Sequence, residues 1–224
     1  MKRNIILSLV LLFVASELVV AEAVNRRVVG LVELPSVFGK CDPKGPPGLV
    51  RPAHVQAVPI YSHPSHNSSI VGQISGLESV ETKEFDYEAP AAVIYKIVDG
   101  WVLIRITDSL KNEFGWVSPH ERGPFHPLVD LLYSGLCYLE EDWDGVLYES
   151  TNTLKSIKRI QVDGKRRDIN IVRSEEHQEA LWLEVELLGP GRCKGENPEV
   201  LAKGWVPAHK KDGKPNVWFY SRGC

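Results

Sequence analysis

The chain of 224 residues carries 26 Lys and Arg side chains against 29 Asp and Glu, which gives a net charge of −3 at pH 7. A nearly neutral, slightly acidic chain lacks the basic surface that nucleic-acid binding requires, so we expect no nucleic-acid partner. After the first 23 residues about 200 remain, enough for one large domain or two small ones.

Residues 1–23 have the pattern of a cleaved secretory signal peptide. Positive charge at Lys2 and Arg3 precedes an apolar run over residues 5–15, and Ala21-Glu22-Ala23 supplies a small-x-small cleavage site. The run is too short to span a bilayer comfortably, so an uncleaved membrane anchor is the less favoured alternative. We therefore expect a periplasmic or secreted protein with no transmembrane segment after processing.

Residues 24–52 are interpreted as an N-terminal arm, in which residues 28–34 form an edge strand. Residues 53–135 are predicted to form a first domain of short strands, which residues 128–133 close. Its expected strands are residues 55–61, 70–74, 80–85, 92–98, 101–106 and 114–118. Between the fourth and fifth of these lies Asp99-Gly100, a dipeptide typical of tight hairpins.

Residues 136–224 are predicted to form a second domain. Its expected strands are residues 146–148, 157–162, 169–172, 181–187, 202–206 and 217–220, with the second and third paired as a hairpin. Residues 174–181 begin with a helix-capping serine, and we expect a loop or a single helical turn there. Short strands without a long amphipathic helix predict an all-β fold of two tandem small antiparallel barrels.

Four segments recur in the same order in both domains, which indicates a duplicated unit. The pairs are residues 58–62 and 145–149, 99–106 and 180–187, 115–120 and 204–209, and 133–137 and 220–224. The clearest pair is the motif Gly115-Trp116-Val117 and its counterpart Gly204-Trp205-Val206.

The first unit resembles the bacterial SH3-like domain family. The resemblance rests on an early aromatic at Tyr61, an apolar strand at Ile70-Val71-Gly72-Gln73-Ile74, the strand beginning Gly100-Trp101-Val102, and the closing Gly115-Trp116-Val117. It covers residues 55–118. It implies two SH3-like barrels in an exported bacterial protein, since members of this family are usually binding modules.

The second unit departs from the family pattern. It keeps Tyr148, Trp182 and Gly204-Trp205-Val206, but no glycine precedes Trp182 and the insertions are longer. The resemblance is therefore weaker for residues 136–224.

Aromatic side chains are the candidate ligand-binding residues, because aromatic grooves recognise extended or proline-rich segments or sugar faces. Trp101 and Trp182 are expected in the core, since they alternate with charged neighbours. The candidate groove aromatics are Tyr61, Trp116, Tyr148 and Trp205. The two tyrosines end first strands beside polar loops, whereas the two tryptophans are equally consistent with a structural role.

Four cysteines, an even number in a chain with an export signal, predict disulfide bonds. First and last strands lie close together in small barrels, which favours Cys41–Cys137 and leaves Cys193–Cys224. The main alternative is Cys137–Cys224 with Cys41–Cys193. The sequence contains no CxxC motif, and a zinc site is not expected.

Other clusters favour solvent-exposed loops over chemistry. His63, His66, His120 and His126 offer a conceivable metal site, but their spacing matches no strong template. The acidic run at residues 140–144 places adjacent carboxylates on different sides of the chain, which favours a solvated turn over acid–base catalysis. We therefore expect no metal and no cofactor.

The sequence favours an exported non-enzymatic binding module for a peptide or cell-wall component of the bacterial envelope. No Gly-x-Ser-x-Gly motif is present, and paired cysteines leave no free thiol nucleophile. Expected partners are a peptide, a peptidoglycan fragment or an envelope protein. The alternative is a structural or inhibitory protein that docks on another envelope protein, and a small hydrolase is a remote third hypothesis.

Overall fold

The structure, a computed structural model, describes residues 27–38, 56–107, 113–159, 165–192 and 197–223, with the backbone alone for residues 153–159. The predicted signal peptide and much of the predicted arm lie outside these ranges. Within them, no helix has both the length and the apolar composition needed to cross a membrane.

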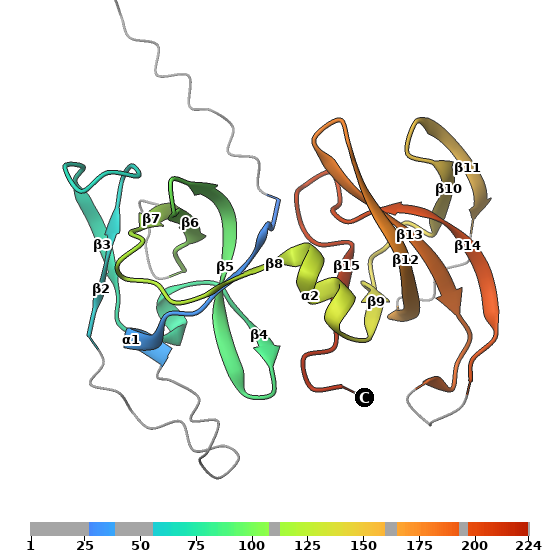
Figure 1. Ribbon diagram of the computed structural model, residues 1–224, viewed down its shortest axis with the longest axis horizontal. Coiled ribbons are helices and arrows are strands. Elements are labelled where there is room, and N and C mark those ends of the chain that lie inside the picture. The colour runs from blue at the N-terminus through green and yellow to red at the C-terminus, as the bar shows by residue number, and fades with distance from the viewer. Residues whose placement is uncertain (1–26, 39–55, 108–112, 160–164, 193–196, 224) are drawn as a thin grey trace, which may run out of the picture.

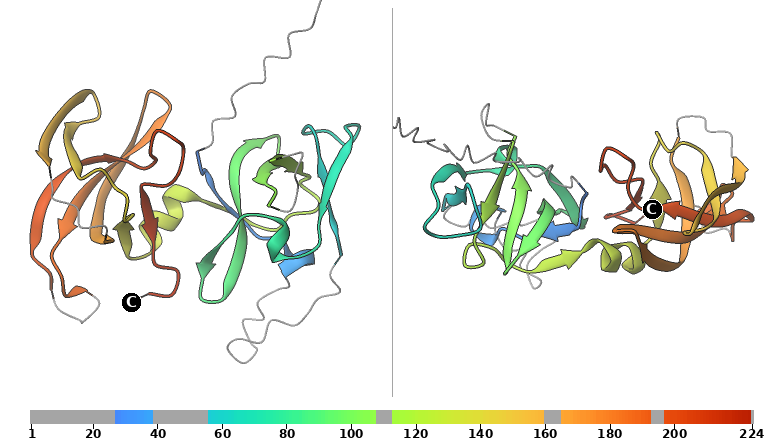
Figure 2. Two further views of the ribbon diagram at one scale, coloured as in Figure 1. Left: turned by 180° about the vertical axis from the view of Figure 1, so that it is seen from behind. Right: turned by 90° about the horizontal axis from the view of Figure 1, so that it is seen from above.

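Two antiparallel sheets lie side by side along the long axis of the molecule (Figure 1), and the views in Figure 2 separate them in the same way. The first sheet has the strand order β3-β2-β7-β6-β5-β1-β8, with β4 paired to β5. Its strands are β1 (Gly30–Val32), β2 (Val58–Tyr61), β3 (Ile70–Ile74), β4 (Thr82–Asp86), β5 (Ala89–Val98), β6 (Trp101–Arg105), β7 (Phe114–Val117) and β8 (Phe125–Pro127). We call this sheet and its loops the first unit.

The second sheet has the order β11-β10-β14-β13-β12-β9-β15. Its strands are β9 (Cys137–Leu139), β10 (Val146–Ser150), β11 (Thr153–Arg159), β12 (Arg167–His177), β13 (Ala180–Leu188), β14 (Val200–Pro207) and β15 (Val217–Phe219). We call it the second unit. Three short helical segments complete the described chain, α1 (Pro35–Phe38), the 3-10 turn η1 (Leu77–Ser79) and α2 (Leu128–Ser134).

The two strand orders match position by position, as expected for a duplicated unit. The match extends to a register shift in corresponding strands, between Ile94 and Lys96 of β5 and between Ile171 and Arg173 of β12. In the first unit Gly30 of β1 lies opposite Ile94 of β5 and Pro127 of β8. In the second unit Cys137 of β9 lies opposite Ile169 of β12 and Phe219 of β15, and Ile169 is two residues before Ile171, the residue that corresponds to Ile94. The repeat predicted from short motifs is therefore a repeat of the whole sheet.

The hairpin predicted at Asp99-Gly100 is confirmed. Both residues have positive φ, 48° and 82°, and Val98 of β5 pairs with Trp101 of β6 across the turn. Two positive φ values are what a tight two-residue hairpin turn requires, and glycine adopts one without steric cost.

Four predicted features differ from the structure. Residues 28–34 do not form an edge strand, because β1 lies between β5 and β8 inside the first sheet. Residues 128–133 close the first unit as helix α2, whose buried residues Leu128, Leu131 and Leu132 have helical spacing.

The other two differences concern the second unit. Residues 174–181 are neither a loop nor a helical turn, because β12 and β13 run on as a long hairpin that turns at Gln178-Glu179. The expected hairpin of residues 157–162 with 169–172 is absent from the described pairings, since β11 pairs with β10 and β12 with β13 and β9. An alternating apolar and polar pattern indicates a strand, but it does not identify which other strand pairs with it.

Strand β5 of the first sheet is buried on both faces over residues 91–95, and its alternating side chains enter two different cores. On β5, Ala92 and Ile94 lie in a core private to the first unit, whereas Ala91, Val93 and Tyr95 lie in a second core. That second core also contains the buried residues of α2 and the interior of the second unit. We call it the shared core. Helix α2 lies between the units (Figure 1), so the two sheets pack as one body around it.

Candidate functional site

A cluster of aromatic rings lies at one end of the first sheet, around Tyr61. The Tyr61 ring meets Trp101 edge-on at 5.3 Å between centroids and His66 at 5.8 Å. His66 lies 4.8 Å from Trp101 and stacks on His120 at 5.9 Å. Trp101 is buried, Tyr61 is half-buried, and both histidines are exposed. We call these four residues the ring cluster. Trp101 is thus the buried member of the ring cluster, and the other three rings are at least partly accessible to solvent.

Trp116 lies outside these ring contacts. It pairs in register with Tyr61 and Leu103, but its side chain packs against the shared core. The structure therefore gives Trp116 a packing role, while both Trp116 and Tyr61 are half-buried.

The second unit repeats the tyrosine–tryptophan contact. Tyr148 meets Trp182 edge-on at 5.4 Å and pairs in register with Trp205. Trp205 is only 5% exposed, and the guanidinium of Arg173 lies 5.0 Å from its ring. Both tryptophans expected in the core, Trp101 and Trp182, are buried. Each candidate tyrosine thus lies beside its candidate tryptophan, but the two pairs are on separate sheets.

The junction between the units contains a cavity of about 870 Å³, which sequence analysis did not anticipate. Both units contribute to it. Its lining residues are Arg27, Val28, Val29, Tyr95, Lys96, Ile97, Phe125, Pro127, Leu128 and Val129 from the first unit and α2, and Ser174, Glu175, Glu176, Glu179, Leu181 and His209 from the second. We call it the junction cavity.

The histidine of the junction cavity is held neutral. His209 Nε2 lies 2.7 Å from the carbonyl oxygen of Val28, to which it donates a hydrogen bond. Burial lowers the pKa of His209 below its usual 6.5, and the charge of Arg27 lowers it further against the opposing effect of that hydrogen bond. This hydrogen bond therefore joins the loop after β14 to the segment that precedes β1.

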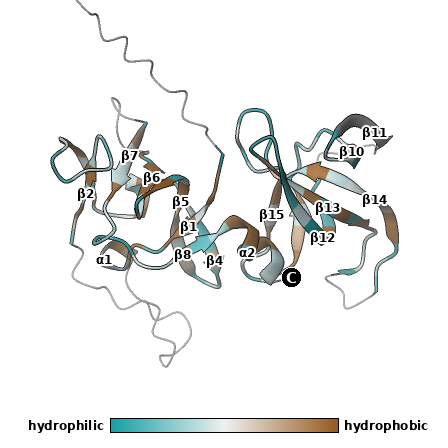
Figure 3. Cartoon of the chain, turned by 45° about the horizontal axis from the view of Figure 1, so that its top comes forward, coloured by the Kyte–Doolittle hydropathy of each residue, from teal (hydrophilic) through white to brown (hydrophobic). Residues whose placement is uncertain are grey.

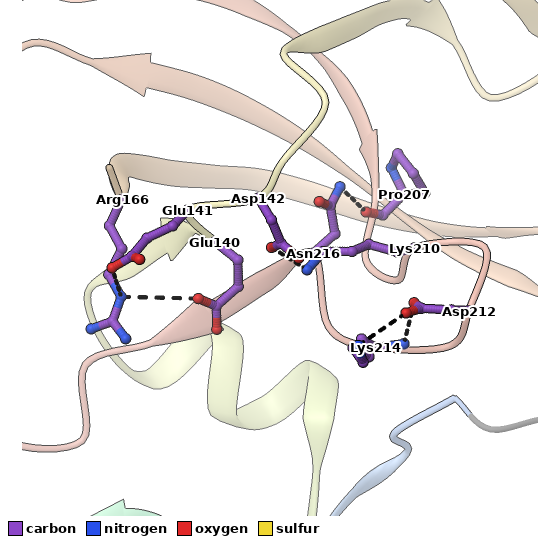
Figure 4. Close-up of polar contacts among 9 residues, drawn as sticks. All are labelled: Glu140, Glu141, Asp142, Arg166, Pro207, Lys210, Asp212, Lys214 and Asn216. Atoms are coloured by element: carbon purple, nitrogen blue, oxygen red, sulfur yellow. Dashed lines mark hydrogen bonds and ion pairs between the residues drawn. The ribbon is translucent and has the colours of Figure 1, made fainter. Parts of the chain in front are cut away.

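A second cavity at the junction, of about 500 Å³, has several paired charges in its lining. Lys210 Nζ contacts Asp142, and Lys214 Nζ lies 3.3 Å from Asp212 (Figure 4). Beside them, Asn216 donates a hydrogen bond to the carbonyl oxygen of Pro207 at 3.0 Å. The polar side chains at Lys210, Asp212, Lys214 and Asn216 thus all have partners within the second unit.

The four histidines considered for metal binding do not come together. His66 and His120 stack in the ring cluster, but His126 lies on β8, where its Nε2 is 2.9 Å from Glu33. His63 instead contacts Ser62 Oγ through Nδ1 at 3.0 Å. Among the described side chains, no group of three or more His, Cys, Asp or Glu residues has a metal-binding arrangement.

Cys137 is the one cysteine that the structure describes, and its thiol is free and buried. Burial raises its pKa to about 12, so the thiol stays protonated at neutral pH. Its Sγ donates a hydrogen bond to the Leu132 carbonyl oxygen at 3.0 Å. Both predicted pairings include Cys137, so the structure shows neither of these disulfide bonds and leaves a thiol where the sequence predicted none. Cys41, Cys193 and Cys224 lie outside the described residues.

No protein-family model matches the sequence, and no curated protein matches it.

Proposed function

We propose that this protein is an exported, non-enzymatic binding module of two SH3-like units, with a peptide or cell-wall component as its ligand. The observation that carries the proposal is the ring cluster, in which Tyr61, His66 and His120 lie accessible over the buried Trp101. Rings offer flat apolar faces with polar groups at their edges, which suits extended peptides and sugar rings.

An apolar neighbour enlarges this surface. Ile70 of β3 lies opposite Tyr61 in register and is 63% exposed, the most exposed large hydrophobic side chain among the described residues. An isoleucine left open beside accessible rings is a feature expected of a contact surface. Periplasmic or secreted localisation is part of the proposal, and it rests on the N-terminal segment of the sequence.

The test is co-sedimentation of the mature protein with purified peptidoglycan. We expect retention that Tyr61→Ala weakens strongly, whereas Tyr148→Ala reports whether the second unit also binds. Tyr133→Ala is the matched control, since Tyr133 is an exposed tyrosine on α2, outside both aromatic pairs.

Loss of retention in the Tyr61 variant alone, with normal folding by circular dichroism, supports a wall-binding ring cluster. Absence of any retention would overturn the cell-wall form of the proposal. Equal retention of the Tyr61 and Tyr133 variants would remove the ring cluster as the site.

A further inference from the structure

The junction cavity has the size and composition of a ligand site rather than of a packing defect. Its volume of about 870 Å³ lies within the range of roughly 300–1,000 Å³ found for small-molecule and cofactor pockets. It is also built from both units, so it exists only because the two sheets pack against each other.

One part of the cavity is an accessible apolar surface. Val29, which precedes β1, and Ile97 of β5 are 37% and 38% exposed, although most large apolar side chains of the first sheet are buried. The half-buried side chains of Phe125 and Leu181 line the same cavity. Single exposed apolar residues are ordinary, but several that share one cavity form a surface that a ligand can cover.

The opposite wall, the end of the β12–β13 hairpin, carries three glutamates. Glu175 is engaged, because its carboxylate accepts a hydrogen bond from Thr151 Oγ1 at 3.0 Å. The carboxylates of Glu176 and Glu179 have neither a hydrogen-bond nor an ion-pair partner among the described residues. The hairpin is the hydrophilic wall of the junction, as the colour of β12 in Figure 3 shows, whereas α2 carries hydrophobic colour.

The cations of the cavity do not neutralise these two carboxylates. Arg27 directs its guanidinium to the main-chain carbonyl of Glu179, not to a carboxylate. Lys96 also lines the cavity and is engaged in an interaction of its own. His209 contributes no charge at neutral pH. Glu176 and Glu179, both exposed, therefore have no ion-pair partner among the described residues, although Arg27 and Lys96 line the same cavity.

We infer that the junction cavity is a binding site for a peptide segment that places a Lys or Arg side chain against Glu176 and Glu179 and apolar side chains against Val29 and Ile97. A charged donor paired with a carboxylate at a partly enclosed site forms a strong, geometrically specific hydrogen bond. The site is distinct from the ring cluster and does not require the ring cluster to bind anything.

The main chain of β12 favours a peptide over another cationic ligand. β9 pairs with β12 only over Arg167, Asp168 and Ile169, so beyond Ile169 the described pairings leave β12 with β13 as its one strand partner. Residues Ser174 to Glu176, which line the cavity, belong to this stretch. An extended segment can add to such an edge by main-chain hydrogen bonds, while its side chains supply specificity.

The test uses capped synthetic peptides of alternating valine and lysine, with matched valine–glutamate and valine–glutamine peptides, titrated calorimetrically into the mature chain. We expect the lysine peptide to bind and the glutamate peptide not to bind. The double substitution Glu176→Gln with Glu179→Gln should weaken binding about tenfold or more, the change in affinity that corresponds to one lost charge-assisted hydrogen bond.

Three controls keep the outcome specific. Glu141→Gln alters an exposed glutamate outside the cavity and should leave the affinity unchanged. Ile97→Ser should weaken binding of the lysine and glutamine peptides alike. Tyr61→Ala should have no effect, so failure of the ring cluster and failure of this site give different results.

Two results would overturn the inference. One is no binding of the lysine peptide, or binding that the double glutamine variant does not change. The other is binding by a chain that begins at Arg27 and none by the mature chain, which would assign the cavity to the protein's own N-terminal residues.

Discussion

The two units share one strand order and differ at their hairpin ends. In the first unit β5 and β6 are joined by the tight turn at Asp99-Gly100, and the ring cluster lies at this end of the sheet. In the second unit the equivalent strands β12 and β13 continue to Gln178-Glu179, and the extra length forms a wall of the junction cavity. The tyrosine–tryptophan contact persists in both units, at 5.3 and 5.4 Å.

The two units are therefore alike in the pairing of their strands and differ in the exposed hairpin ends and loops. Strand order, register and the edge-on ring pair are set by burial and main-chain pairing, which tolerate little change. Hairpin ends and loops are exposed and tolerate changes in length and sequence, so the two units present different surfaces.

The largest expected effect comes from breaking the core that joins the units. Leu139→Ala removes a fully buried side chain of the shared core and should cost about 2–5 kcal/mol of unfolding free energy. Because the core is continuous, urea unfolding of both wild type and variant should follow a single transition. Two separate transitions, with only one displaced, would show that the units fold independently.

The next effect distinguishes the first residues of the corresponding strands β1 and β9. A Cβ on Gly30 would lie 2.3 Å from the main-chain oxygen of His126, so Gly30→Ala should cost about 1–3 kcal/mol by overpacking. Cys137, which begins β9 as Gly30 begins β1, already accommodates a side chain, and Cys137→Ala should cost less. Both variants are compared by thermal unfolding in the presence of reductant, so that Cys137 is a free thiol in every sample. An equal or larger loss for the Cys137 variant would contradict this ranking.

A smaller, pH-dependent effect is expected at His209. The folded pKa of His209 lies below 6.5, so the unfolded chain takes up the proton first as pH falls. The stability that neutral His209 contributes is complete above pH 6.5 and is lost as pH falls towards the folded pKa.

Unfolding followed by tryptophan fluorescence between neutral and mildly acidic pH tests this contribution. His209→Gln should flatten the loss of stability with acid, because it removes the buried imidazole that the unfolded chain protonates first. Identical pH slopes for the His209 variant and wild type would refute it.

The smallest effect is expected at the charged contact between the units. Arg222 Nε lies 2.7 Å from Glu84 Oε2, and this partner lowers the pKa of the Glu84 carboxyl. Arg222 is solvent-exposed, so Arg222→Gln should lower stability slightly at low salt and leave it unchanged at high salt. A large, salt-independent loss would place the pair among the main supports of the junction.

Local patterns were sufficient to predict most strands. The hairpin at Asp99-Gly100 needs only its own dipeptide, and the duplicated Gly-Trp-Val motifs indicated the repeated sheet. Helix α2 also had a readable signal, since Leu128, Leu131 and Leu132 follow helical spacing, but seven residues are too few to outweigh the surrounding strand pattern.

The partners of β1 and the junction cavity depend on contacts distant in sequence. One clue to the junction was present in residues 91–95, an unbroken apolar run that does not alternate. Such a run is typical of a strand covered on both faces, and β5 is covered by two cores. The ring cluster was only half predictable, because its histidines reach Tyr61 and Trp101 from loops whose course no pattern fixes.

The place of β1 between β5 and the edge strand β8 governs the order in which the first unit can assemble. This strand is synthesised first, yet it pairs with β5 and with β8, the last strand of its sheet. Long-range pairings of this kind slow folding, because the loop-closure entropy must be overcome before the contacts form. A nascent chain therefore cannot complete its first sheet until Pro127 has emerged, and the second sheet has the same dependence on β15. Each unit of this protein is finished by its final strand.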